Sequence, residues 1–304
     1  MALTLPRLQV TLGPVYFNWG ADLLRDFYAR IADEAPVDRV YIGEVVCGKR
    51  TPLIAEALAD SADRLQRSGK EVVWSSLIAP ANRRERASMK ELAALGDELE
   101  INDIGALTPE SASGFTAGPF LNIYNEATLD TLVRRGCRRW CPPVELSIDA
   151  VAKVNAARPD IAVELFAFGR LPLAHSSRCY HARYHGLNRD SCRYVCETDP
   201  DGCRVDTLDG EAFLAFNGLQ TLSDGVQVCD APLERLREAG IGVLRLSPQS
   251  CDMVAVAHAF RDRLDARINA GELKARLAGE TLGRPMVNGY LNDRAGMARI
   301  SREA

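Results

Sequence analysis

The chain has 304 residues, of which 47% are hydrophobic and 26% are charged, and these values are typical of a folded globular protein. Its formal net charge is −4 with both signs interspersed, so the sequence shows no basic field for binding nucleic acid. No apolar run approaches the roughly 18 residues of a membrane-spanning helix, and the N-terminus lacks the pattern of a signal peptide. We therefore expect a cytoplasmic protein with no membrane span.

Short β-rich runs alternate with helical runs from one end of the chain to the other. The alternation predicts eight strands, at residues 8–15, 39–46, 71–77, 100–104, 115–124, 137–141, 161–168 and 242–246. It predicts helices at residues 22–32, 51–65, 81–95, 125–133, 148–157, 233–239 and 252–264. This α/β pattern favours a (β/α)8 TIM-barrel-like fold. A doubly wound sheet is the alternative, because periodicity does not reveal whether a sheet closes. We expect one barrel domain over residues 1–280 and a C-terminal tail over residues 281–304.

A Cys-rich insertion separates the predicted seventh and eighth strands, over residues 170–230. It contains a predicted hairpin around the sequence FLAFNGLQTLSDG. Connections of this length within a compact domain are usually functional. The insertion follows the carboxyl end of a strand, and barrel active sites assemble at that face. We therefore expect the chemistry of this protein at the carboxyl ends of the strands.

Four of the nine cysteines can meet at this face: Cys179, Cys192 and Cys196 in the insertion, and Cys47 at the end of the second predicted strand. An odd count without a secretion signal indicates reduced thiols rather than disulfides. Four thiolates can hold an iron–sulfur cluster or a structural zinc ion. Zinc ligands usually occur as close pairs, so the isolated Cys47 favours iron–sulfur, with zinc and no metal as alternatives. Cys203 is a spare thiol that could replace one of the four.

Histidines and arginines accompany the thiols along the insertion. His175, His181 and His185 could join a mixed site, but four thiols already complete a coordination shell. We therefore expect these histidines to donate hydrogen bonds around the ligands. Nearby arginines would favour thiolates and offset the charge of an anionic cluster. They are Arg178, Arg183, Arg189 and Arg193.

Five polar residues at predicted strand ends are candidates for binding substrate: Glu44, Asn122, Tyr124, Glu145 and Arg245. Glu44 could instead form a buried salt bridge with Arg50, and Glu145 could pair with Arg170. Arg245 could grip a carboxylate through two hydrogen bonds, although barrel rims also hold structural arginines. The neighbouring Asn125 is expected to cap a helix. The sequence alone identifies no catalytic residue.

Several longer motifs carry a resemblance to a known family. The segments YIGEVVCGKR, NIYNEATL, RRWCPPVELS, GRLPLAHSSRC, NGLQT and RLSPQ resemble the peptidase U32 family. Within that family, they are similar to the members that act in ubiquinone biosynthesis. The likeness extends through most of the chain and includes the segment NGYL near its C-terminus.

The resemblance implies a barrel-like fold and a [4Fe–4S] cluster held by Cys47, Cys179, Cys192 and Cys196. It also implies an oxygen-independent hydroxylation of the ubiquinone precursor ring. This work would be shared with a related U32-family subunit in a heterodimer and with a lipid-carrier-like accessory protein. Because four thiolates leave no iron position open on a cubane, we expect the cluster to transfer electrons or to stabilise the structure.

Two other functions are compatible with the sequence. The chain could be a non-catalytic scaffold that docks a catalytic relative, in which case the isolated chain would bind only its partner and not the quinone precursor. The family name denotes peptidases, but the sequence contains neither HExxH nor GxSxG. Thiols that hold a cluster are also poor nucleophiles, so peptidase activity is the weaker alternative.

Overall fold

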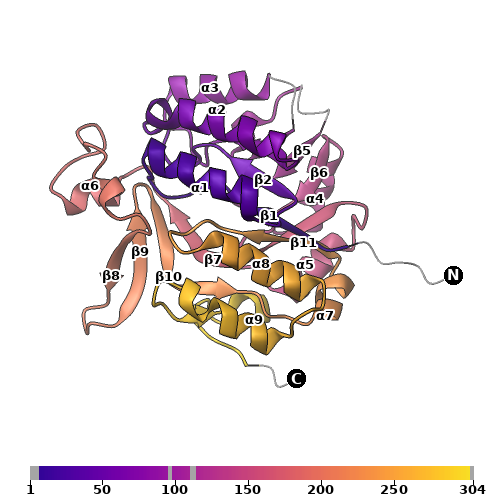
Figure 1. Ribbon diagram of the computed structural model, residues 1–304. Helices are drawn as coiled ribbons and strands as arrows, with labels where there is room; N and C mark the ends of the chain where they lie inside the picture. The colour runs from indigo at the N-terminus through magenta and orange to yellow at the C-terminus, as the bar shows by residue number, and fades with distance from the viewer. Residues whose placement is uncertain (1–6, 95–97, 110–113, 302–304) are drawn as a thin grey trace.

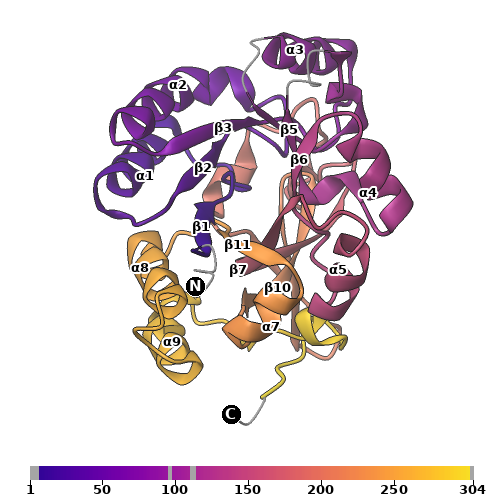
Figure 2. The same cartoon turned by 90° about the vertical axis from the view of Figure 1, so that its right-hand side faces the viewer.

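The computed structural model (Figure 1) describes residues 7–94, 98–109 and 114–301. Eight parallel strands form a closed barrel, because each pairs with the next and the last, β11, pairs with both β7 and β1. The barrel strands are β1 (Gln9–Leu12), β2 (Arg39–Ile42), β3 (Glu71–Ser75), β4 (Leu99–Ile101), β5 (Phe115–Ala117), β6 (Cys137–Trp140), β7 (Ala162–His175) and β11 (Ile241–Leu246). Figure 2 looks along the barrel, with the strands inside and the helices around them. The predicted (β/α)8 fold is confirmed, and the doubly wound alternative is wrong.

Helices cover the outside of the barrel. They are α1 (Ala21–Glu34), α2 (Thr51–Arg67), α3 (Arg83–Ala93), α4 (Glu126–Val133), α5 (Ile148–Asn155), α7 (Leu233–Glu238), α8 (Met253–Leu264) and α9 (Ala270–Leu277). Short 3₁₀ turns join them: η1 (Ile104–Ala106), η3 (Pro119–Leu121), η5 (Ala278–Glu280) and η6 (Tyr290–Asn292). Residue 95, at the end of the predicted helix 81–95, lies outside the described residues. None of the helices in the described ranges is long and apolar enough to cross a membrane.

The helices begin and pack for local reasons that are visible in the sequence. On α1, Leu24, Tyr28 and Ile31 are buried at helical spacing, so one stripe of the helix faces the barrel. The side chains of Asn125 and Ser147 accept backbone N–H groups in the first turns of α4 and α5. The predicted cap at Asn125 is therefore confirmed.

Strand β7 runs beyond the predicted strand 161–168 and carries the insertion out of the barrel. Its first part pairs with β11, and its last part pairs antiparallel with β10 (Gln220–Val228). The insertion is completed by α6 (Tyr180–Tyr184), η4 (Val195–Thr198), β8 (Cys203–Asp206) and β9 (Ala212–Asn217). Gly169 and Pro172 indicate a strand end in the sequence, but pairing with β10 keeps the segment extended through both.

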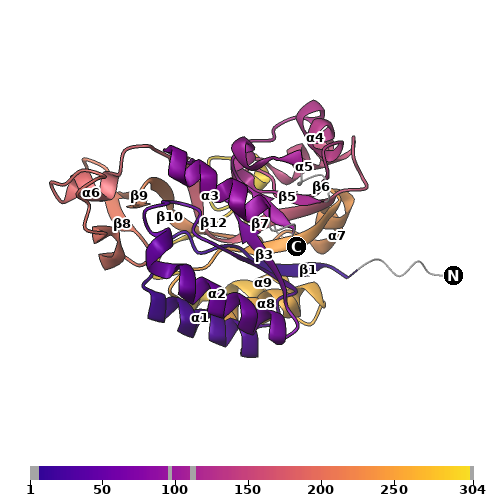
Figure 3. The same cartoon turned by 90° about the horizontal axis from the view of Figure 1, so that it is seen from above.

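The insertion lies at the end of the barrel opposite the start of β1, as Figures 1 and 3 show. Because the barrel strands are parallel and β7 leads directly into the insertion, this end holds their carboxyl termini. The predicted hairpin is present as the antiparallel pair of β9 and β10. The insertion therefore stands at the face of the barrel where active sites assemble.

The described part of the predicted tail packs against the barrel domain. Strand β12 (Met286–Val287) pairs with β10. Asn288 Nδ2 donates hydrogen bonds to Asp230 Oδ1 and to the backbone oxygen of Ile300, both at 3.0 Å. The last three residues of the predicted tail, 302–304, lie outside the described residues.

Charged side chains fill the interior of the barrel. Arg245 Nε lies 2.7 Å from Glu164 Oε1, and Arg245 Nη1 lies 2.5 Å from Glu100 Oε1. Tyr41 donates a hydrogen bond to Glu164 Oε2 over 2.7 Å, and Arg139 Nη1 lies 3.3 Å from the same oxygen. Burial opposes ionisation of Glu164, but the charges of Arg245 and Arg139 outweigh it and lower its pKa to about 2. Each of these four charges, on Arg245, Arg139, Glu100 and Glu164, has an opposite charge close by, which is the condition for keeping it in a protein core.

Candidate metal centre and rim cavity

Cys47, Cys179, Cys192 and Cys196 line one small cavity, here called the thiol cavity. The loop after β2 carries Cys47, and Cys179 immediately precedes α6. Cys196 lies in η4, and Cys192 lies in the segment before it. Cys179 and Cys196 are buried, while Cys47 and Cys192 are half-buried. The structure therefore brings together the four thiols that the sequence singles out.

The sulfur of Cys196 accepts two hydrogen bonds. It lies 3.3 Å from Asn18 Nδ2 and 3.4 Å from Arg50 Nη2. The same Arg50 nitrogen lies 2.8 Å from Asn217 Oδ1, and Asn217 Nδ2 donates to the backbone oxygen of Cys196 over 2.9 Å. N–H groups that point at a ligand sulfur stabilise its negative charge. These surroundings suit a thiolate ligand.

Two further sulfurs also have donors close by. Lys49 Nζ lies 3.8 Å from Cys192 Sγ and is held by the backbone oxygen of Arg189 at 2.6 Å. The backbone N–H of Ala182 donates to Cys179 Sγ over 3.4 Å, so Cys179 caps α6. Three positive side chains border the thiol cavity: Lys49, Arg50 and Arg189. Positive charge at this place favours thiolates.

Glu44 shapes the loop that carries Cys47. Its Oε1 accepts the backbone N–H groups of Val46 and Cys47, each at 2.8 Å, and lies 3.8 Å from Arg50 Nη1. Burial raises the pKa of Glu44, although the Arg50 charge opposes the shift. The prediction that Glu44 binds substrate is corrected, because its carboxylate is turned into its own loop and forms the ion pair with Arg50 instead.

The spacing of the four sulfur atoms can be compared with the spacing that a single metal ion requires. Tetrahedral zinc with Zn–S bonds of about 2.3 Å holds its sulfurs about 3.8 Å apart. Within the described ranges, no three of these sulfur atoms all lie within 4.8 Å of one another. No three of these sulfur atoms therefore stand at the spacing that a single tetrahedral ion requires.

The other five of the nine cysteines lie outside the thiol cavity. Cys203 belongs to β8, and its sulfur lies 3.9 Å from the backbone oxygen of Arg204. Burial raises the pKa of Cys137 to about 12 and that of Cys229 to about 11, as in thiols that serve as packing groups. The structure thus keeps the spare thiol Cys203 apart from the set of four.

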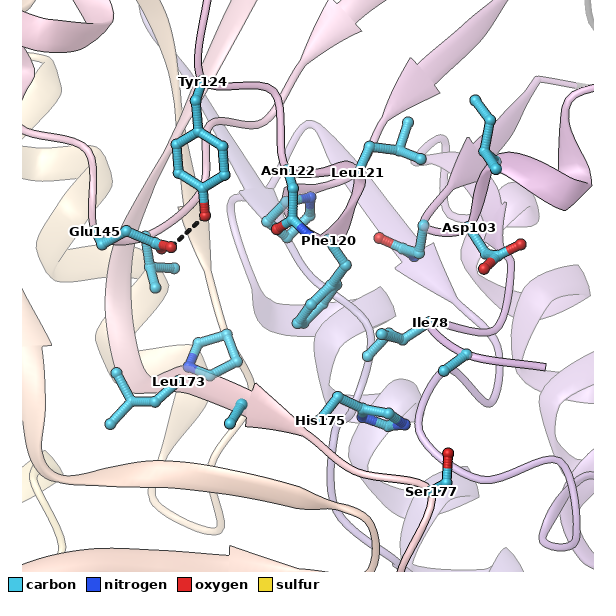
Figure 4. A pocket seen from close by; sticks show the side chains of 17 residues that line it. Ile78, Asp103, Phe120, Leu121, Asn122, Tyr124, Glu145, Leu173, His175 and Ser177 are labelled. Atoms are coloured by element: carbon cyan, nitrogen blue, oxygen red, sulfur yellow. Dashed lines mark hydrogen bonds between the residues drawn. The ribbon is translucent and has the colours of Figure 1, made fainter. Parts of the chain in front are cut away.

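A larger cavity, here called the rim cavity, has a volume of about 650 Å³. Its walls come from the loops that follow β3, β4, β5 and β6 and from the last part of β7, as Figure 4 shows. Its polar and aromatic members include Asn102, Asp103, Phe120, Asn122, Tyr124, Glu145 and His175. A concave wall with a few converging polar groups is the usual form of a small-molecule site.

Three of the predicted substrate-binding residues line the rim cavity: Asn122, Tyr124 and Glu145. Tyr124 donates a short hydrogen bond to Glu145 (Figure 4), and burial together with the Glu145 charge raises the pKa of Tyr124. Asn122 has a left-handed backbone with φ 55°, and such strain often occurs at binding sites. Glu145 does not pair with Arg170, which instead donates to the backbone oxygen of Ser223 at 2.8 Å.

Arg245 lies inside the barrel and not on the wall of the rim cavity. Its side chain is fully buried between Glu100 and Glu164. The prediction that Arg245 binds substrate is therefore corrected. Its charge neutralises the buried carboxylates of Glu100 and Glu164. The prediction failed because the sequence places Arg245 at a strand end but does not show which way its side chain points.

His175 faces the rim cavity and makes no hydrogen bond to a sulfur, because neither of its ring nitrogens has a hydrogen-bond partner among the described residues. Asn102 Oδ1, buried on the same wall, also lacks a partner. Burial lowers the pKa of His175 to about 4, with help from the charges of Arg189 and Arg50, so its ring is neutral at pH 7. Buried polar groups normally have partners, so these two can bind polar atoms of a ligand.

Sequence reasoning missed the donors around the thiols, and on the wall of the rim cavity it missed Asn102 and Asp103. A signal existed for Arg50, which lies three positions after Cys47 in CGKR, and for Asn217, which begins NGLQT. Asn18 had no such signal, because only the fold brings it to Cys196.

One curated relative is tRNA hydroxylation protein P of Haemophilus influenzae, which is 35% identical over 145 residues. The alignment covers 44% of this chain and 32% of that protein, so the chain spans about a third of the length of this relative.

Two solved structures show low similarity to the chain. A mandelate racemase/muconate lactonizing protein from Paracoccus denitrificans PD1222, complexed with magnesium, matches with a TM-score of 0.37 and 14% identity over 55% of this chain and 50% of that chain. A tandem GH20 catalytic module of the pneumococcal exo-beta-D-N-acetylglucosaminidase matches with a TM-score of 0.28 and 7% identity, over 53% of this chain and 59% of that chain. With scores this low, neither structure informs the chemistry of this chain.

The family comparison covers nearly the whole chain. The model of peptidase family U32 matches residues 24–300, a range that includes the four thiols and the rim cavity. The chain therefore belongs to peptidase family U32.

Proposed function

We propose that this chain is an iron–sulfur protein of an oxygen-independent hydroxylation, and that the ring of a ubiquinone precursor is the substrate. Membership of peptidase family U32 and the likeness to a relative named for tRNA hydroxylation support a role in hydroxylation. The observation that carries the proposal is the arrangement of Cys47, Cys179, Cys192 and Cys196 around one cavity.

The donor set fits a [4Fe–4S] cluster better than one zinc ion. The sulfurs are too far apart for a single tetrahedral ion, and they receive N–H groups from Asn18, Lys49, Arg50 and Ala182. When bound, such a cluster accepts and donates single electrons. The chain holds the four thiolates in place, offsets their charge with cations and shields Cys179 and Cys196 from water.

The rim cavity suits an uncharged aromatic substrate. None of its described lining residues is Lys or Arg, whereas Asp103 and Glu145 bring carboxylates. Phe120 offers an apolar ring face, and the unpartnered atoms of Asn102 and His175 can hydrogen-bond a phenolic hydroxyl. A phenol-type ring therefore fits this wall better than a phosphate-bearing ligand.

The two cavities lie close together in the fold. His175 ends β7 on the wall of the rim cavity, and Cys179 follows four positions later on the thiol cavity. The charges of Arg50 and Arg189, which border the thiol cavity, act on the His175 ring. This proximity supports a function in which electrons pass between the cluster and a bound ring.

Hydroxylation of RNA is the second candidate, and the name of the Haemophilus influenzae relative favours it. Binding to nucleic acid depends on Lys and Arg contacts to phosphates. The rim cavity has no such residue in the parts of its wall that the structure describes, and the net charge of the chain is −4. These observations support the quinone precursor over RNA as the substrate.

The chain acts with a related U32-family subunit in a heterodimer and with a lipid-carrier-like accessory protein. The resemblance of the motifs around the four thiols supports this assembly. If the chain is a scaffold only, the isolated chain binds the partner and not the precursor. Calorimetric titration of the precursor, and separately of a transfer RNA, into the isolated chain distinguishes the three functions.

The cluster is tested by metal analysis of protein purified without air. Wild-type chain should be brown and contain roughly four irons. Cys→Ala at position 47, 179, 192 or 196 should remove the colour and anaerobic quinone synthesis together. Cys203→Ser is the matched control and should keep both. A colourless wild-type protein, or a quadruple variant that supports full quinone synthesis, would contradict the proposal.

A further inference from the structure

Two histidines and one aspartate converge in the insertion at a point separate from the four sulfurs. His181 lies in α6, His185 follows that helix, and Asp199 follows η4. One ligand atom from each residue lies within 4.8 Å of the other two. Among the described residues, no other group of three or more His, Cys, Asp and Glu side chains is this close.

The helix and its neighbours hold these side chains together. His185 caps the C-terminus of α6 four positions after His181, so the two side chains lie on the same side of this turn, and their rings stack at 5.5 Å between centroids and 14° between planes. Asn217 Nδ2 donates to the backbone oxygen of Asp199 over 2.8 Å, and Thr198 Oγ1 lies 3.1 Å from Asp199 Oδ2. The carboxylate is thus fixed beside the two imidazoles.

The contact between His181 and Asp199 has the distance of a hydrogen bond but not its direction. Nε2 lies 3.0 Å from Oδ2, yet neither ring nitrogen of the fully buried His181 makes a hydrogen bond. A hydrogen bond needs the donor, hydrogen and acceptor near one line. Two ligands bound at about 2.1 Å to one ion at near-right angles lie about 3 Å apart and off that line. The observed separation of 3.0 Å agrees with this second arrangement.

We propose that His181, His185 and Asp199 form a metal site that binds one divalent ion of the first transition series. Two imidazoles and a carboxylate suit Zn²⁺, Fe²⁺ or Mn²⁺. His185 is exposed, so water can fill the remaining positions. The ion would complete the bonding of the buried His181 imidazole, whose ring nitrogens otherwise have no hydrogen-bond partner among the described residues.

The site has a structural consequence for the thiol cavity. Cys179 caps α6, two positions before His181, and Asp199 lies three positions after Cys196. An ion shared by His181 and Asp199 therefore ties together the two segments that carry these thiols. The site is nevertheless built from other residues, so it does not depend on a cluster being present.

The test is a titration of the purified chain with Mn²⁺, followed by the loss of the free-ion signal in electron paramagnetic resonance. Mn²⁺ prefers carboxylate and nitrogen ligands over thiolates, so the four cysteines do not compete for it. Wild-type chain should bind one Mn²⁺ whether or not iron is loaded. His185→Ala should weaken binding at least about tenfold. His258→Ala, which changes an exposed histidine on α8, should leave it unchanged.

Asp199→Asn keeps the shape of the side chain, removes its charge and should weaken Mn²⁺ binding in the same way. Thermal unfolding of each variant checks that the fold is intact. The inference is overturned if wild-type chain binds no Mn²⁺ at millimolar concentration, or if His185→Ala and His258→Ala bind it equally. Because iron content is measured in the same samples, loss of the cluster and loss of this site are told apart.

Discussion

Arg50 donates a hydrogen bond from Nη2 to the sulfur of Cys196 over 3.4 Å. The same guanidinium reaches Asn217 Oδ1 at 2.8 Å and lies 3.8 Å from Glu44 Oε1. Glu44 in turn accepts the backbone N–H of Cys47. One buried cation therefore connects the loop of Cys47 to the segment of Cys196, although the two thiols are far apart in the chain.

We expect Arg50→Lys to weaken the cluster. Lysine keeps the positive charge but loses the planar fork that reaches Cys196, Asn217 and Glu44 at once. Iron should be lost in air about tenfold faster than from the wild type, as is common when groups around metal ligands are changed. Absorbance decay of anaerobically purified protein measures this rate. Arg183→Lys, at an exposed position on α6, is the control. Equal decay in both variants would remove Arg50 from the set of supporting residues.

Gly218→Ala should displace the guanidinium of Arg50, because the added methyl group would collide with it. Gly218 has φ +67°, and a Cβ there would lie 2.4 Å from Arg50 Nη2. Gly283 is a matched control, because it has φ +69° and a Cβ there would meet no atom within 4 Å. Gly283→Ala should destabilise the fold by about 1 kcal/mol through backbone strain alone.

Gly218→Ala should destabilise it by about 1–3 kcal/mol more, because the displaced guanidinium adds packing strain. Its iron content should also fall, whereas that of Gly283→Ala should not. Urea unfolding and iron analysis measure the two effects. If both variants lose the same stability and keep their iron, the close approach of Gly218 to Arg50 has no role in the site.

Tyr124→Phe should separate substrate binding from the cluster. The variant keeps the ring and removes the hydroxyl that donates to Glu145 in the rim cavity. Because Tyr124 is 43% exposed, stability should change by less than about 0.5 kcal/mol, and iron content should be unchanged. Affinity for the quinone precursor should fall about tenfold, because the variant loses the hydroxyl that hydrogen-bonds the charged Glu145 carboxylate on the cavity wall. Calorimetry measures this, with Tyr180→Phe, at 46% exposure, as the control. Unchanged affinity would place the substrate elsewhere.

Glu164→Gln should change how stability depends on pH. The folded pKa of Glu164 is about 2 and the ordinary value is 4.5, so its ionised form contributes stability that is complete above pH 4.5 and is lost as the pH falls toward 2. The difference corresponds to about 3 kcal/mol at neutral pH. Denaturant unfolding between pH 7 and about pH 3 should show a smaller loss of stability in the variant than in the wild type.

Glu56→Gln, at an exposed position on α2, should keep the pH dependence of the wild type. Glu164→Gln should also be less stable at neutral pH, because it leaves the charge of Arg245 with Glu100 as its one close carboxylate partner among the described residues. A variant with wild-type stability across this range would show that the interior ion pairs contribute nothing to folding.

The sequence by itself determined the elements and the thiols that matter. The hydrophobic periods of strands and helices are local, so they predicted the order of these elements along the chain. The side chain of Asn125 caps a helix, as its position in the sequence predicted. The four cysteines stood out because Cys179, Cys192 and Cys196 share one short stretch of the insertion and Cys47 follows a predicted strand. Strand order in a parallel barrel then placed them at one face.

Only the tertiary structure decided which polar side chains face which cavity. Arg245, Glu44 and Tyr124 all lie at predicted strand ends. Buried partners turn Arg245 and Glu44 inward, whereas Tyr124 lines the rim cavity. His175 became part of that cavity because β7 stays paired past Gly169. These outcomes depend on contacts between residues far apart in the chain. A shift of one residue in strand register would turn each side chain to the opposite face, so no local sequence pattern predicts which way it points.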